Sequence, residues 1–169
     1  CGDDEFRGRT GPLNITDTPE RGRLYDSLIA AAGVHGINPA DDYNGAVQDG
    51  ITMSQTTIHK GRRMSTARCY LDPVRRRPNL TIQANALARA LTFDGKKCTG
   101  VRYTVNGVGR TARAGREVIV SAGSINSPQL LELSGIGNPD ILKDQGIEVV
   151  HALNGVGENL RDHYAPRFR

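Results

Sequence analysis

The feature that most constrains the fold is a short apolar run that ends in small residues and leads into a helix start. Residues 117–120 read Glu-Val-Ile-Val without polar alternation, which is typical of a strand buried on both faces. The small residues 121–123 follow, and Ser127 with its neighbouring proline then predicts a capped helix start. This helix carries the leucines of 130–133, and we expect it to end at Gly135. A buried strand joined to a helix by small residues predicts an α/β fold.

Local signals divide the rest of the chain into short elements. Residues 18–33 are predicted as a helix that is capped by Thr18 and ended by Gly33 or Gly36. A shorter helix is expected over residues 65–71. Further on, the sequence predicts a strand over 80–82, a helix opened by Asn138 and ended by Gly146, and a strand over 147–150.

A three-stranded antiparallel meander is predicted in the middle of the chain. Residues 86–93 and 98–105 flank Asp94-Gly95, and residues 108–113 follow Asn106-Gly107. Both dipeptides suit tight hairpin turns because Asn, Asp and Gly tolerate positive φ.

Composition narrows the class of protein. The 169 residues are 37% hydrophobic and 24% charged with a net charge of +4, as in an ordinary globular domain. The arginines are dispersed and are not interleaved with aromatics, so we expect no nucleic-acid partner. No apolar stretch approaches the roughly 20 residues of a membrane span. The three cysteines have no metal spacing and are interpreted as reduced thiols. We therefore predict a cytoplasmic protein, with membrane association as the alternative.

Three blocks carry a resemblance to one family. Residues 123–137, Gly-Ser-Ile-Asn-Ser-Pro-Gln-Leu-Leu-Glu-Leu-Ser-Gly-Ile-Gly, resemble the second signature of the glucose–methanol–choline oxidoreductases. Residues 155–163 resemble the family's GVGENLQDH stretch, with Arg161 where Gln is usual. Residues 61–71 and 77–81 resemble its GRR-x-S-x-AR-x-YL and RPNLT segments. The resemblance leans towards choline and alcohol dehydrogenases.

The resemblance implies FAD as cofactor and the oxidation of a CH–OH group of a small alcohol, with hydride passing to the flavin. The electrons would go on to a quinone-like acceptor or to oxygen. It also implies that Ala122 and Gly123 border the FAD and that the main chain at Ala88 meets the adenine. A strand ending in small residues before a helix does place N–H groups and a helix dipole beside a cofactor. The same arrangement is also ordinary α/β packing, and that alternative stays open.

The remaining polar residues are interpreted as structural. No G-x-S-x-G elbow occurs, so Ser127 is predicted to be a helix cap and not a nucleophile. His59 and His163 lie in or next to the family-like blocks, and both a place near the substrate cavity and a structural or surface role stay open. No two histidines stand at metal-ligand spacing. We therefore predict neither a metal nor a catalytic residue in this chain.

Two parts that the family's chemistry needs are not found in this sequence. They are the GxGxxG unit that holds the flavin diphosphate and the C-terminal block with the catalytic His; Gly155-x-Gly157 lacks the third glycine. We interpret the chain as an internal fragment that is inactive by itself. The alternative is a non-catalytic, stand-alone binding module derived from a flavoprotein fold.

The expected fold is α/β with some α+β character. It comprises a partial FAD-binding, Rossmann-like domain with an antiparallel meander, and part of a substrate-binding domain. The predicted division assigns residues 1–72 to the substrate-binding part, 73–158 to the FAD-binding part and 159–169 to a return to the substrate-binding part.

Overall fold

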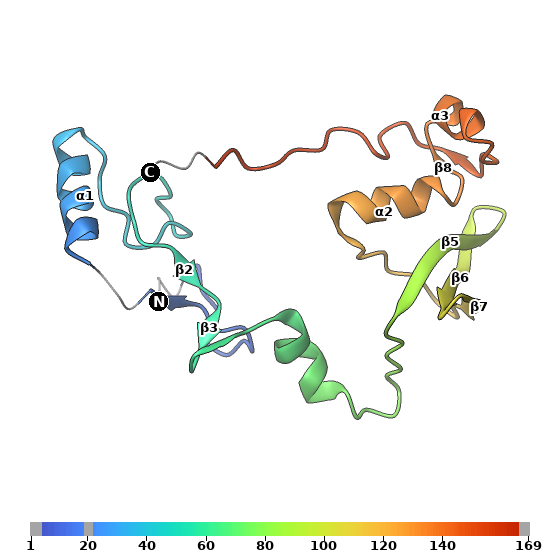
Figure 1. Cartoon of the computed structure of the whole chain (residues 1–169), viewed down its shortest axis with the longest axis horizontal. Coiled ribbons are helices and arrows are strands. Elements are labelled where there is room, and N and C mark those ends of the chain that lie inside the picture. The colour runs from blue at the N-terminus through green and yellow to red at the C-terminus, as the bar shows by residue number, and fades with distance from the viewer. Residues whose placement is uncertain (1–4, 19–21, 166–169) are drawn as a thin grey trace. The chain divides into compact units, whose positions relative to one another are not determined.

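The computed structural model describes residues 5–18 and 22–165, and these fall into two compact units. Unit 1 is Cys1–Ile82 and unit 2 is Gln83–Arg169. Figure 1 shows the elements of both units in chain order. Helices and antiparallel strands occur together, so the expected mixture of α and β structure is confirmed.

The described residues of unit 1 form one α-helix, two further short turns of helix, short strand pairs and loops. Strand β1 (Thr16–Asp17) pairs antiparallel with β2 (Gln55–Thr56). Strands β3 (Ile58–His59) and β4 (Arg62–Arg63) form a hairpin. Its turn residues, Lys60 and Gly61, both have positive φ (49° and 71°), as the two central residues of a type I′ turn require.

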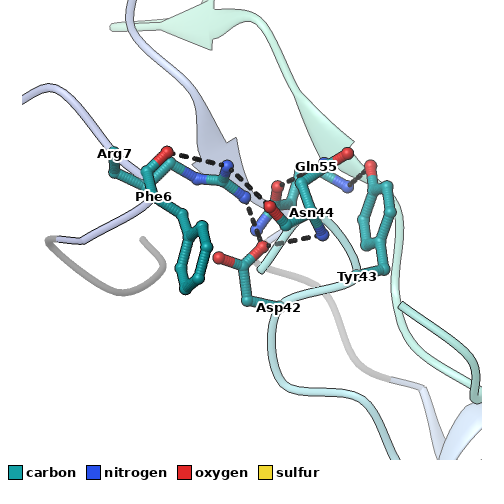
Figure 2. A network of polar contacts seen from close by, with 6 residues as sticks. All are labelled: Phe6, Arg7, Asp42, Tyr43, Asn44 and Gln55. Atoms are coloured by element: carbon teal, nitrogen blue, oxygen red, sulfur yellow. Dashed lines mark hydrogen bonds and ion pairs between the residues drawn. The ribbon is translucent and has the colours of Figure 1, made fainter. Parts of the chain in front are cut away.

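A partly buried ion pair ties the start of unit 1 to a loop 35 residues later. The Arg7 guanidinium contacts the Asp42 carboxylate, and the two side chains are only 14% and 12% exposed. The Arg7 Nη1 group also donates to the carbonyl of Asn44 at 3.3 Å, and the Gln55 amide donates to Asp42 Oδ1 at 3.4 Å. Figure 2 shows how these side chains converge, with the Tyr43 hydroxyl accepting from the backbone of Gln55. The network holds three stretches of a polar, turn-rich unit together.

The first helix begins later than predicted. Helix α1 spans Arg23–Val34 with Gly22 as its N-cap residue. Thr18, the predicted N-cap, does not cap the helix and donates its hydroxyl to the carbonyl of Ser54 at 2.7 Å. Residues 19–21 lie outside the described residues. The predicted end is confirmed at Gly36, which has φ 75° just after the helix.

The segment predicted as a short helix is a π-type turn of helix. It covers Ala67–Leu71 and buries Cys69, and a 3₁₀ turn over Asp72–Val74 continues it. Residues 80–82, predicted as a strand, form none. They pair with no described strand, which a β-strand requires, and the Leu80 N–H instead donates to the carbonyl of Arg77 at 3.1 Å in a turn.

The predicted meander is confirmed and dominates unit 2. It consists of β5 (Ala86–Asp94), β6 (Lys97–Val105) and β7 (Val108–Arg113) in the order β5-β6-β7, all antiparallel. The turn residues Asn106 and Gly107 have φ 51° and 79°. This turn therefore acts as the sequence predicts. At the first hairpin the turn is shifted by one residue: Asp94 pairs with Lys97, and of the predicted Asp94-Gly95 pair only Gly95 has positive φ, at 56°.

The strand predicted over 117–120 is wrong. These residues belong to no strand, and Ile119 is 79% exposed. A parallel strand that is buried on both faces needs a hydrogen-bonded neighbour on each side, and no described strand lies beside it.

The helix after it starts four residues before the predicted cap. Helix α2 spans Gly123–Glu132, so Ser127 and Pro128 lie inside it. The Ser127 hydroxyl reaches back to accept from the backbone N–H of Ala122 at 3.0 Å. It still satisfies a donor at the helix start, although from within the helix. Pro128 removes only its own backbone hydrogen bond in the early turns.

The end of unit 2 packs two short strands and a helix. Strand β8 (Ile136–Gly137) pairs parallel with β9 (His151–Ala152), and α3 (Pro139–Asp144) connects them. The predicted helix is confirmed, with Asn138 as the N-cap whose Oδ1 accepts from the N–H of Asp140 at 3.0 Å. The strand predicted over 147–150 is wrong: the strand that pairs with β8 is His151–Ala152, and Val150 before it donates its N–H to the carbonyl of Gly135 at 2.8 Å.

Candidate functional site

The candidate site is the N-terminal end of α2, which lies in the family-like segment 123–137. Ala122 is the N-cap residue. The Ser127 hydroxyl accepts from its N–H, but no side-chain acceptor is described for the N–H groups of the first turn itself. The first N–H groups of a helix have no partner inside it, and they carry the positive end of the helix dipole. Residues 122–125 are exposed, so this end faces solvent and can accept an anionic or polar group.

Helix α3 supplies the contrast. Its N-terminus is closed by the Asn138 side chain, whereas α2 is left without such a cap. Of the two helices in unit 2, α2 alone therefore keeps its first-turn donors free of side-chain acceptors in the described structure.

Gly123 is required where it stands. Its φ is 92°, and no heavy atom lies within 4 Å of the place where a Cβ would sit. A side chain there would be strained by the backbone conformation and not by crowding. The space beside this main chain is open, which fits a ligand that lies close against the backbone.

Ala88 lies on a second element of the same unit. It is an exposed residue of β5, paired in register with Tyr103 of β6. The register shifts between Ala88 and Ala90, so a bulge follows Ala88 directly. Strand β5 packs against α2. The structure thus places Ala88 and the pair Ala122–Gly123 on two elements that contact each other.

A pocket of about 450 Å³ lies between α2 and the 155–160 segment. Ser124, Pro128 and Glu132 line it from the helix, and Gly155, Gly157 and Leu160 line it from the segment opposite. The two blocks that carry the strongest resemblance therefore meet at one surface. The contact was not predicted from the sequence. The local feature that could have indicated it is the glycine at position 157, which the structure shows at φ 83°.

The two candidate histidines lie in different units. His59 is on β3, half-buried and paired with Arg62 in the hairpin, and His163 is exposed. Neither imidazole ring has a described acid or amide partner; the His163 hydrogen bond to Asp162 Oδ1 is made by the His163 backbone N–H. Ser127 behaves as a backbone acceptor at the start of α2, which supports a structural role.

No group of three or more His, Cys, Asp or Glu side chains in residues 5–18 and 22–165 could hold a metal ion. None of the helices in this part of the chain combines the length and apolar character needed to cross a bilayer. Cys69 and Cys98 are free thiols.

A family model described as GMC oxidoreductase matches residues 3–165. The oxygen-dependent choline dehydrogenase of Chromohalobacter salexigens is 47% identical over 165 residues, which are 96% of this chain and 29% of that protein. A choline dehydrogenase of the same description from Yersinia pseudotuberculosis is 48% identical over 167 residues, again 29% of its length. The chain thus spans 29% of the length of these curated relatives.

Solved structures give the same picture. The FAD-dependent oxidoreductase from Chaetomium thermophilum is similar with a TM-score of 0.88 and 31% identity, over 95% of this chain and 28% of that one. Pyridoxine 4-oxidase from Mesorbium loti is similar with a TM-score of 0.81 and 30% identity, over 88% of this chain and 29% of that one.

Proposed function

Because the chain belongs to the GMC oxidoreductase family, we propose that it forms part of the flavin-binding and substrate-binding regions of an FAD-dependent enzyme that oxidises alcohols. One observation carries the proposal. The segment that resembles the family's second signature forms a helix whose N-terminus is open, with Ala122 and Gly123 exposed at its start. An open helix N-terminus favours phosphate and other anionic groups.

The proposed ligand of this backbone is the adenine nucleotide part of FAD. The N–H groups of the first turn of α2 would hold a polar or anionic part of the FAD, and the absent side chain of Gly123 would let it approach. The main chain at Ala88 would meet the adenine. When bound, FAD supplies the hydride acceptor for alcohol oxidation.

The chain's own residues bind and orient in this proposal. None of them is assigned a proton-transfer role. The whole reaction would need the rest of the enzyme, because this chain corresponds to 29% of the length of the matched relative. We therefore propose that the chain alone is inactive. We also propose residues 1–72 and 159–169 as parts of the substrate-binding region and 73–158 as part of the flavin-binding region.

The substrate is proposed to be a small alcohol, with choline as the first to test. Relatives at 46–48% identity are named as choline dehydrogenases. Their names include "oxygen-dependent", so oxygen stands beside a quinone-like compound as the proposed electron acceptor. We propose a cytoplasmic location, which cell fractionation would test.

A titration of the full chain with FAD and with ADP tests the binding role. Flavin fluorescence anisotropy follows FAD, and displacement of FAD follows ADP. We expect saturable binding of both, because the proposed contacts lie at the adenine end. A folded chain that binds neither ligand would contradict the proposal and favour a binding module with another partner.

A further inference from the structure

Ser134 stands out among the polar residues of the described chain. It is the one polar or charged side chain in this part of the molecule that is buried, at 8% exposure. A buried hydroxyl costs free energy unless both its donor and its acceptor capacity are used. The structure shows that both are used.

The two hydrogen bonds of Ser134 go to different elements. Its Oγ donates to the carbonyl of Leu130, one turn back in α2, and accepts from the backbone N–H of Leu91 at 2.8 Å. A serine that bonds the carbonyl four residues earlier is common near helix ends. The bond to Leu91, across 43 residues of sequence, is the informative one.

Leu91 lies in β5, which is an edge strand of the meander. Strand β6 covers one side of β5, so backbone groups on the other side have no strand to pair with. Ser134 takes the N–H of Leu91 on that open side. Leu91 and Leu130 are both buried next to this bond, at 7% and 8% exposure. The hydroxyl thus joins the edge of the sheet to α2 within the apolar core.

The bond acts on the two elements that carry the proposed FAD contacts. On β5, Leu91 follows Ala88 just beyond the bulge between Ala88 and Ala90. A bulge loosens the register of a strand, and the bond to Ser134 fixes the strand directly after it. On α2, the helix that Ser134 anchors at its end begins at Gly123.

We infer that Ser134 is a positioning residue for the adenine end of the FAD, through the hydrogen bond that sets β5 against α2. This inference rests on the proposed function of the same site. Ser134 touches no ligand in this account. It holds the Ala88 main chain at a defined distance from the start of α2.

The test compares serine variants of the full chain. Ser134→Ala leaves the Leu91 N–H buried without an acceptor, and we expect the Kd for FAD to rise about tenfold or more. Ser134→Thr keeps the hydroxyl and is expected to stay within about threefold of the unsubstituted chain. The matched control is Ser27→Ala, which removes the hydroxyl that bonds Arg23 O four residues earlier in α1 but joins no second element. It should leave the Kd unchanged.

Two readouts separate positioning from a general loss of stability. Every Kd is measured at a temperature where circular dichroism shows the variant folded, because stability alone does not alter binding by folded molecules. The Kd for ADP should rise by the same factor as that for FAD, since the claim concerns the adenine end. If Ser134→Ala does not fold, Ser134→Cys, a weak donor and acceptor, takes its place with the same expected direction.

The outcomes decide between the two claims. The inference is supported if Ser134→Ala raises the Kd for FAD and for ADP about tenfold, while Ser134→Thr and Ser27→Ala keep both Kd values close to those of the unsubstituted chain. An unchanged Kd in a folded variant without the hydroxyl overturns it and leaves the proposed function standing. If the folded, unsubstituted chain binds neither FAD nor ADP, the proposed function fails and the positioning role fails with it.

Discussion

Gly157 lies directly against the carboxylate of Glu132. A Cβ built on Gly157 would be 2.9 Å from Glu132 Oε1, and the glycine has φ 83°. This contact joins the Gly-Val-Gly-Glu-Asn segment to the C-terminal end of α2, beside the pocket that both of them line. Two sequence blocks that resemble the same family are thus one structural feature.

Gly157→Ala should lower the stability of the chain by about 1–2 kcal/mol, because an L-residue is strained at positive φ. The steric part is small, since the end of the Glu132 side chain can move away. Gly155→Ala is the matched control: Gly155 has no positive φ and no heavy atom within 4 Å of its Cβ position. Urea unfolding measures both. Equal losses in the two variants would contradict the backbone strain expected at Gly157.

Gly135→Ala is expected to be far more damaging. Its Cβ would lie 2.3 Å from the carbonyl oxygen of Glu148, and that oxygen belongs to the backbone. We expect a loss of about 3 kcal/mol or more, from overlap added to the strain at φ 83°. Gly95→Ala has positive φ but open space, so about 1 kcal/mol is expected there. Similar midpoints of urea unfolding for the two variants would show that the close packing is absent.

Gly123→Ala tests the open backbone at the start of α2. Gly146 is its control, because both glycines have positive φ (92° and 68°) and neither has a heavy atom within 4 Å of its Cβ position. Each alanine variant is therefore expected to lose a similar amount of stability through backbone strain. We expect only Gly123→Ala to weaken FAD binding, by about tenfold, because a methyl group would stand where the ligand approaches. Equal Kd values would remove Gly123 from the site.

Removing Arg7 should destabilise unit 1 by about 2–3 kcal/mol, because it leaves the mostly buried Asp42 carboxylate without its cation. Arg75→Ala is the control. Its partner Asp72 is 3.0 Å away, but both side chains are more than half exposed, so a loss below about 1 kcal/mol is expected. In Arg7→Ala combined with Asp42→Ala, the loss should be smaller than the sum of the single losses. Additive losses by urea unfolding would contradict a coupled pair.

Sequence reasoning succeeded where the signal is local. Asn106-Gly107 and Asn138 each determine a turn or a cap with their own backbone and side-chain atoms, and the structure confirms the meander and α3. These features need no distant partner.

It failed where the outcome depends on neighbours. Residues 117–120 have the composition of a buried strand, but pairing requires adjacent strands and the described chain offers none there. The strand predicted over 147–150 is shifted to His151–Ala152, because the close approach of the backbone at Gly135 sets where pairing with β8 begins. The Leu91–Ser134 bond joins residues 43 positions apart, and no local pattern indicates it.

The central claim is that this chain supplies a working part of a flavin site, and one exchange tests it directly. The chain would replace the matching 165-residue segment of the Chromohalobacter salexigens choline dehydrogenase. The purified chimera and its parent would then be compared for flavin absorbance per protein and for bleaching by choline. We predict that the folded chimera carries flavin as the parent does and that choline reduces it. A folded chimera that carries no flavin, beside a parent that does, would contradict the account.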